Sequence, residues 1–194
     1  GEQLFLVALI VAGICLIMGM GIPTTAAYVL VAAVLAPALT RMGVEPLVAH
    51  LFVFYFATIS VITPPVCIAV FVAAGIAQAG WLQVAGHAVR LGATTYIIPF
   101  LILAYPALIG MGDAWDITVA ALRALAFVLA FAGVLGGARL TGRRLLDAVI
   151  LSTVGVLAVL PGAAPGLVGV IGLFALYGWA WNVARRNQLQ GASS

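Results

Sequence analysis

Glycine, proline and hydroxyl residues gather at two points inside otherwise apolar stretches of this 194-residue chain. The first, Gly19–Thr25, reads GMGIPTT, and the second, Ser60–Pro65, reads SVITPP. Such residues interrupt helices, because proline lacks an N–H and glycine adopts conformations that other residues avoid. A broken helix inside hydrocarbon persists only where its freed backbone groups line a cavity enclosed by protein. Two breaks close together therefore predict a binding site of the kind found in membrane transporters.

The oxygen atoms at these breaks form a candidate cation site. The two prolines of the second break leave the carbonyls of Ser60 and Val61 without their helical donors, and the proline of the first break does the same for Gly19. Thr25 and Thr63 add hydroxyl oxygens beside these carbonyls. Because a cluster of neutral oxygens suits a hard monovalent cation, we expect a sodium ion to be bound by Gly19, Thr25, Ser60, Val61 and Thr63.

The first break also offers backbone N–H groups to an anion. A helix N-terminus carries partial positive charge, and the helix that begins at Thr24 keeps donors that the proline pair of the second break lacks. We expect Thr63 to cap the helix that follows the second break. The residues expected to contact the substrate are Gly21, Pro23, Thr24, Thr25 and Thr63.

Composition indicates an all-α integral membrane protein. Hydrophobic residues make up 65% of the chain and charged residues 7%, and the mean hydropathy is +1.29, which is outside the range of soluble domains. The net charge of +3 comes from arginines scattered between apolar runs, so it reports topology and predicts no nucleic-acid partner. Cys15 and Cys67 lie singly in apolar segments and are expected to pack rather than form a disulfide.

We expect two modules, residues 1–110 and 111–194. The first holds four elements: a re-entrant helical hairpin over 4–41, a discontinuous helix over 47–79, an interfacial elbow over 81–91 and a transmembrane helix over 94–110, bent or loosened at Pro99 and Pro106. One bent span explains the hairpin segment equally well. The second module holds three plainer spans, Ile117–Gly137, Leu145–Leu160 and Gly166–Val183.

Arginine placement predicts the orientation of these spans. Arg139, Arg143 and Arg144 share one short loop, and Arg185 and Arg186 close the last span, whereas the loop between these spans is uncharged. The positive-inside rule therefore places the C-terminus in the cytoplasm. Counting back along the spans, the hairpin enters the membrane from the outside.

Other functions fit the residues less well. A channel would be expected to show a charged pore ring, and none is evident. An intramembrane enzyme would need Ser60 and His50 to meet, although helical rise separates them by about 15 Å, so we expect no enzyme. The spans between Leu4 and Ile109 contain no Asp or Glu, which disfavours a proton-coupled carrier and favours sodium. A purely structural subunit would leave both breaks unexplained.

The breaks belong to longer motifs that resemble the large membrane subunit of tripartite ATP-independent periplasmic (TRAP) transporters. These motifs are GMGIPTTAAY at Gly19–Tyr28, then APAL at Ala36–Leu39, and AHLFVFYF at Ala49–Phe56 leading to ITPPV at Ile62–Val66. They are most similar to the TAXI branch, whose two membrane subunits are commonly fused. The resemblance covers about residues 1–110, and the region after it is similar to the extra C-terminal helices of some fused permeases.

The resemblance implies half of an inverted-repeat elevator transporter, multi-pass in the bacterial inner membrane. It implies sodium-coupled import of a small organic acid that a periplasmic substrate-binding protein delivers. In that family the hairpin tip and the neighbouring broken helix help form the sodium and substrate sites, which here are Gly19–Thr25 and Ser60–Pro65. We expect this chain to be a C-terminal fragment that works in the lipid bilayer with the remainder of the fused permease chain.

Overall fold

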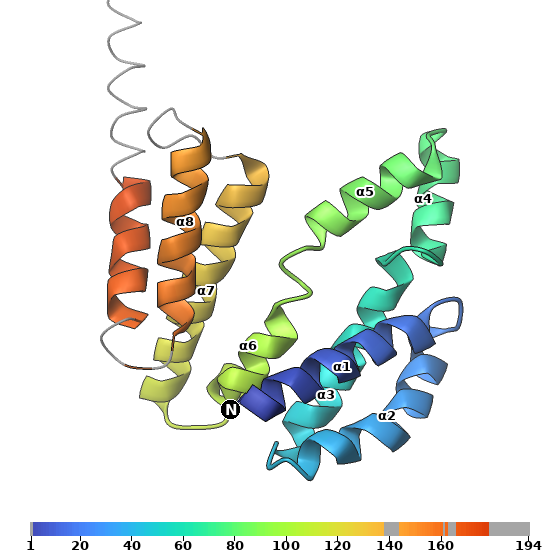
Figure 1. Ribbon diagram of the computed structural model, residues 1–194, viewed down its shortest axis with the longest axis horizontal. Coiled ribbons are helices and arrows are strands. Elements are labelled where there is room, and N and C mark those ends of the chain that lie inside the picture. The colour runs from blue at the N-terminus through green and yellow to red at the C-terminus, as the bar shows by residue number, and fades with distance from the viewer. Residues whose placement is uncertain (1, 138–143, 161, 163–165, 179–194) are drawn as a thin grey trace, which may run out of the picture. The chain divides into compact units, whose positions relative to one another are not determined.

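A computed structural model describes residues 2–137, 144–160, 162 and 166–178, and every regular element within these ranges is a helix (Figure 1). The chain divides into two compact units, Gly1–Met111 and Gly112–Ser194. The predicted all-helical class is therefore confirmed for the described residues. The inverted repeat and the elevator architecture stay predictions.

The first unit begins with three helices packed side by side: α1 (Glu2–Gly19), α2 (Thr24–Thr40) and α3 (Pro46–Ile59). Small residues let these helices approach closely, and aromatic side chains from α3 fill the space between them. Their shared core includes Ala8, Cys15, Ala36, Phe52 and Phe56. Helix α3 begins at a proline, and the Glu45 carboxylate before it accepts a hydrogen bond from the backbone N–H of Val48 at 3.1 Å.

Helix α3 is followed by a 3₁₀ turn, η1 (Ser60–Ile62). Two further helices come after it, α4 (Ile68–Ala77) and α5 (Trp81–Leu91). Helices α4 and α5 bend by 118° at the residues between them, the geometry of a broken span or a re-entrant loop. Cys67, Val70 and Ala85 form the small core that holds this bend. Both cysteines are buried free thiols. The segment expected to be an interfacial elbow is helix α5, and its place at a membrane interface stays a prediction.

Residues 94–110, which are expected to form one helix bent or loosened at its prolines, contain a shorter helix and a 3₁₀ turn. Residues 92–97 are turns, α6 spans only Ile98–Ala104, and a 3₁₀ turn, η2 (Pro106–Ile109), follows. Proline explains both ends of α6. Pro99 lies in its first turn, where a missing N–H costs nothing, and Pro106 cannot donate the bond that would extend the helix.

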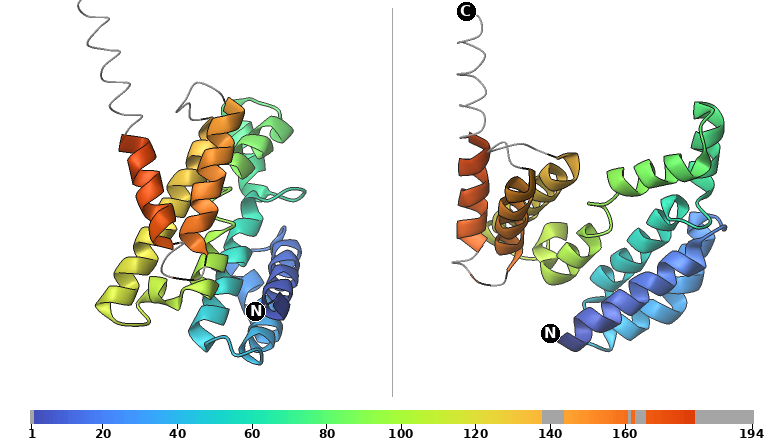
Figure 2. Two further views of the ribbon diagram at one scale, coloured as in Figure 1. Left: turned by 60° about the vertical axis from the view of Figure 1, so that its left-hand side comes forward. Right: turned by 45° about the horizontal axis from the view of Figure 1, so that its top comes forward.

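The second unit is a layer of three helices: α7 (Ala114–Gly136), α8 (Arg144–Val159) and an unlabelled helix, Gly166–Gly178 (Figure 2). Its core consists mostly of small residues, with Ala130 of α7 and Ala158 of α8 among them. The Tyr177 hydroxyl donates a hydrogen bond to the backbone carbonyl of Leu129 at 3.1 Å, which links the last described helix to α7.

Of the described helices, α7 alone is long and apolar enough to cross a membrane, and the bent pair α4 and α5 passes the same test only when counted together. The expected span Leu145–Leu160 corresponds to α8, whose 16 residues fall short of the roughly 20 that a crossing takes. Several parts of the orientation argument lie outside the described residues. They are the loop arginines Arg139 and Arg143, the pair Arg185 and Arg186, and the end of the last expected span. The predicted orientation therefore stays a prediction.

Candidate functional site

The first break is the turn between α1 and α2. Gly21 adopts a φ of +82°, a left-handed conformation that favours glycine, and Pro23 (φ −57°) occupies the N-cap position of α2. Because Gly21 permits the reversal and Pro23 sets the entry angle of α2, the two helices run back along each other as a hairpin. The alternative of one bent span does not describe this geometry.

The hairpin tip lies directly against the second break. Gly19, the last residue of α1, is buried, and a Cβ placed on it would meet Ser60 Oγ and lie 2.9 Å from Ser60 Cβ. A Cβ on Gly21 would lie 3.5 Å from Val66 Cγ1. Gly19 and Ser60 are 41 positions apart in the sequence, yet the fold brings the two interruptions into contact at these residues.

Ser60 is the best-buried polar residue of the second break. Its side chain is 0% exposed, and its hydroxyl donates a hydrogen bond to the carbonyl of Ala57 at 2.7 Å. Its own carbonyl accepts from the N–H of Thr63 at 3.1 Å. The expectation that this carbonyl lacks a donor is therefore wrong, because the chain tightens into a 3₁₀ turn before the prolines and supplies a bond from three residues ahead.

Thr63 lies within a short hydrogen-bonded chain. Its hydroxyl bonds the carbonyl of Ile59 at 2.9 Å and the hydroxyl of Tyr96 at 2.7 Å. Thr63 is not the cap of the following helix, as the sequence predicts. Helix α4 begins at Ile68 with Cys67 at the N-cap position, since the residues after the two prolines stay non-helical for several positions.

Two of the expected carbonyls do lack donors. Among the described residues, no backbone N–H donates to the carbonyl of Gly19 or to that of Val61. In each case the residue four positions ahead is a proline, as the sequence indicates. These oxygens remain able to accept a hydrogen bond or to coordinate a cation.

The threonines of the first break do not join the second break. Thr24 is partly exposed and Thr25 is exposed, both in the first turn of α2, and neither hydroxyl forms a hydrogen bond within the described part of the chain. The residues predicted to bind sodium therefore fall into two groups. Gly19, Ser60, Val61 and Thr63 lie at or beside the contact between the breaks, whereas Thr25 lies on the outer surface of α2.

Tyr96 is a site residue that the sequence reasoning missed. It lies in the turns before α6, and its hydroxyl reaches Thr63 across 33 positions of sequence. Gly92, nearby, is also close to this break, because a Cβ on it would lie 2.9 Å from Ile62 Cδ1. The run Thr94-Thr95-Tyr96 between two apolar stretches is the signal that marks this segment.

His50 and Ser60 do not form a catalytic pair. The Nδ1 atom of His50 lies 3.1 Å from the hydroxyl of Tyr28 on α2, and the imidazole is exposed. Ser60 lies ten residues farther along the chain, nearly three helical turns away just past the end of α3, and donates to a backbone carbonyl instead. The geometry gives the serine no base to activate it.

In this unit, which is apolar and all-helical, two interrupted helices meet at one point. This arrangement is typical of one class of protein, the helical membrane transport proteins whose binding sites lie at helix breaks. Residues 1–117 match the family described as tripartite ATP-independent periplasmic transporter, DctM component, and the chain belongs to this family. It is therefore a permease component of a secondary transporter, and the family is not one of enzymes. No curated protein and no solved structure matches the sequence.

Membership of the family has two consequences for this chain. The family is that of multi-pass proteins of the bacterial inner membrane. Its members work with a periplasmic binding protein and carry a small substrate. The resemblance to TRAP permeases that the two motifs indicate is thus confirmed.

Proposed function

We propose that this permease imports an organic acid together with sodium ions by an elevator-type movement, and that it belongs to the TAXI branch with a fused membrane chain. The contact between Gly19 and Ser60 is the observation that carries this proposal. This contact joins the hairpin tip to the broken helix. A substrate bound at the tip and a sodium ion bound at the broken helix would therefore be held by parts of the chain that touch each other.

The oxygens at this contact have the character that sodium requires. The carbonyls of Gly19 and Val61 have no N–H donor among the described residues. Thr63 has one hydroxyl hydrogen, which it gives to Ile59, so it accepts from Tyr96 and keeps one lone pair. Unwound carbonyls together with hydroxyl oxygens supply neutral hard ligands, as sodium sites in broken transporter helices do.

The substrate side of the proposal rests on the first turn of α2. The helix has Pro23 at its N-cap position, and no side chain caps it. Its free N–H groups and partial positive charge would attract a carboxylate. Thr24 and Thr25 lie in this turn and would add hydroxyl donors to a bound carboxylate. Gly21, which has no side chain, leaves room beside the tip.

Uptake into proteoliposomes tests the proposal. The complete permease is reconstituted, a panel of radiolabelled organic acids is offered, and the periplasmic binding protein and an inward sodium gradient are added or omitted separately. We expect accumulation only when both are present. Thr63→Ala should raise the sodium concentration for half-maximal uptake roughly tenfold, since a bond to a charged group contributes about 1.5–3 kcal/mol.

Thr58→Ala is the matched control for Thr63→Ala. Thr58 lies on α3, and its hydroxyl donates to the carbonyl four residues back, Phe54, at 2.8 Å, as Thr63 does to Ile59. Thr58 is exposed and lies before the break, so its loss should leave the sodium dependence unchanged. Uptake that ignores sodium but follows a proton gradient would replace the proposal with a proton-coupled carrier, and passive flux without the binding protein would replace it with a channel.

A further inference from the structure

The hydroxyl of Thr63 can serve a cation only if its free lone pair points toward that cation. A hydroxyl oxygen has one hydrogen and two lone pairs besides its bond to carbon. The hydrogen of Thr63 goes to the carbonyl of Ile59 at 2.9 Å, so Tyr96, whose hydroxyl is 2.7 Å away, must donate its own hydrogen and occupy one lone pair. Three of the four directions around this oxygen are thus taken, and one lone pair in one fixed direction remains.

Tyr96 is held in place by packing that does not involve the second break. Its side chain packs against the core that α1, α2 and α3 share, and so does Phe100 of α6, four residues farther along the chain. The ring of Phe100 lies 5.2 Å from the ring of Phe52 and 5.6 Å from that of Phe56, both on α3. Aromatic pairs at these separations attract each other, so α6 is anchored on α3 and the turn before it is placed accordingly.

The turn over residues 92–97, which carries this tyrosine, is itself ordered. The backbone N–H of Thr95 donates a hydrogen bond to the carbonyl of Gly92 at 2.9 Å. Gly92 leaves room for Ile62 of η1, because a Cβ on this glycine would lie 2.9 Å from Ile62 Cδ1. The turn therefore packs closely against η1, and the phenol reaches Thr63 from a fixed framework.

We propose that Tyr96 is a positioning residue of the sodium site. By donating to Thr63, it fixes the one lone pair that Thr63 offers to the ion and thereby raises the affinity for sodium without touching the ion. This inference rests on the proposed function, since it needs Thr63 to be a sodium ligand. A ligand that is already aimed has no rotational freedom left to lose when the ion binds, which is the general advantage of a preorganised site.

Binding of ²²Na⁺ to the purified complete permease, measured by scintillation proximity, tests this inference with sodium itself as the probe. Tyr96→Phe should raise the half-saturating sodium concentration about fivefold, the effect of one hydrogen bond. The maximal amount of sodium bound per protein should stay unchanged. A tyrosine that only stabilised the fold would give the opposite pattern, lower maximal binding at an unchanged half-saturating concentration, and this result would overturn the inference.

A double-mutant cycle shows whether Tyr96 acts through Thr63. Thr63→Val removes the oxygen and should by itself raise the half-saturating sodium concentration roughly tenfold, the loss of one bond to a charged group. With no oxygen left to orient, adding Tyr96→Phe should change that concentration by less than about 1.5-fold. A fivefold loss in both backgrounds would mean that Tyr96 acts elsewhere, and the inference would be wrong.

Thr63→Ser keeps the inference testable even if Tyr96→Phe does not fold. Serine retains the hydroxyl but lacks the methyl group that restricts χ1 of threonine. If the bonds to Ile59 and Tyr96 fix the hydroxyl, the half-saturating sodium concentration should stay within about twofold of its value in the unsubstituted chain. A loss as large as that of Thr63→Val would show that the methyl group fixes the hydroxyl, and would overturn the role of Tyr96.

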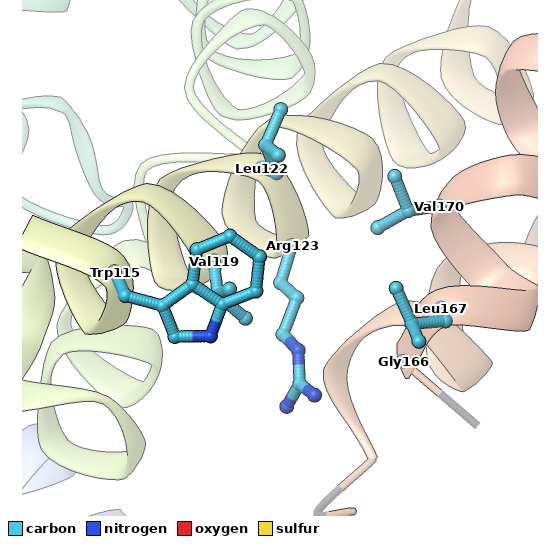
Figure 3. A pocket seen from close by; sticks show the side chains of 7 residues that line it. All are labelled: Trp115, Val119, Leu122, Arg123, Gly166, Leu167 and Val170. Carbon is cyan, nitrogen blue, oxygen red and sulfur yellow. The ribbon is translucent and has the colours of Figure 1, made fainter. Parts of the chain in front are cut away.

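The second unit supplies the matched control. None of the residues expected to bind sodium lies in this unit, whose pocket between α7 and the helix Gly166–Gly178 is lined mostly by apolar side chains (Figure 3). Tyr177→Phe removes a tyrosine hydroxyl that is also hydrogen-bonded, here to the carbonyl of Leu129 at 3.1 Å. It should leave the half-saturating sodium concentration unchanged, and a fivefold rise would show that Tyr96→Phe reports only a general loss of stability.

The same binding curves separate failure of this inference from failure of the proposed function. An unsubstituted permease that binds no sodium would overturn both. An unsubstituted permease that binds sodium, with Tyr96→Phe binding it equally well and Thr63→Val binding it more weakly, would overturn the role of Tyr96 and leave sodium coupling in place.

Discussion

Replacing Gly19 with alanine tests whether the two breaks meet as closely as the structure indicates. The new Cβ would lie 2.9 Å from Ser60 Cβ and closer still to Ser60 Oγ. Carbon atoms in ordinary contact are about 3.5–4.0 Å apart, so one of the two residues must move by roughly 0.6–1.1 Å. Ser60 cannot yield freely, because it is fully buried and its hydroxyl is bonded to Ala57. Overpacking of this kind costs about 1–3 kcal/mol.

A double-mutant cycle separates this contact from a general effect of the substitution. Ser60→Gly removes both atoms that the new Cβ would meet, and the next atom, the carbonyl oxygen of Ala57, is 3.4 Å away. The Gly19→Ala, Ser60→Gly double variant should therefore recover most of the loss. We expect a coupling free energy of about 1–2 kcal/mol. The assay is equilibrium unfolding in mixed dodecyl maltoside and SDS micelles, followed by circular dichroism.

Gly13→Ala is the control for Gly19→Ala. It lies on the same helix, and nothing is within 4 Å of the position that its Cβ would take. It should be neutral or slightly stabilising, since alanine favours the helix more than glycine does. Equal losses for the Gly13 and Gly19 variants, or a double variant as unstable as the sum of its parts, would refute the contact between α1 and the second break.

Two further substitutions test other contacts. Gly169→Ala would drive a Cβ into the backbone of Ala158, 2.5 Å from its Cα, so the free energy of unfolding of the second unit should fall by about 3 kcal/mol, or the unit should fail to fold. Gly178→Ala places its Cβ in open space and should cause no such loss. Chemical unfolding of the purified chain distinguishes the two variants, and similar stabilities would contradict the packing of Gly169 on Ala158. Tyr96→Phe removes the hydroxyl 2.7 Å from that of Thr63 and should cost about 1 kcal/mol, but it should cost little in a chain that already carries Thr63→Val. Additive losses in the same assay would place the two hydroxyls apart.

Local chemistry made the first break predictable from sequence. The φ of +82° at Gly21 and the start of α2 immediately after Pro23 follow from the conformational freedom of glycine and from the fixed φ of proline. The donors missing at Gly19 and Val61 also follow from the position of each proline four residues ahead. These features need no knowledge of distant parts of the chain.

Features that depend on distant or competing contacts were not predictable. The end of η1 gives the carbonyl of Ser60 a donor from Thr63, because a 3₁₀ bond spans three residues and avoids the prolines. The partnership of Thr63 with Tyr96 joins segments 33 positions apart, and no local pattern encodes it. The start of α4 at Ile68 instead of directly after Thr63 likewise has no local signal, and Cys67 at its N-cap position is buried with Val70 and Ala85.

The lone arginine within α7 was also open to prediction. Arg123 lies near the middle of α7, which alone among the described helices is long enough to cross a membrane, and a charge there is costly unless it has a role. Sequence reasoning used the other arginines to set orientation and passed over this one. Its neighbour Gly166, which makes room for it, is 43 positions away and becomes meaningful only once the helices are placed.

The close approach of Gly19 to Ser60 has a mechanical consequence. Because Gly19 has no side chain, its backbone packs directly against the buried side chain of Ser60, and the smallest opening of the hairpin tip is a displacement of backbone. The buried core that α1, α2 and α3 share resists such a displacement along its whole length. These three helices thus form one rigid block, and the chain leaves that block at η1 and the two prolines after it, where the hinge of any larger movement would fall.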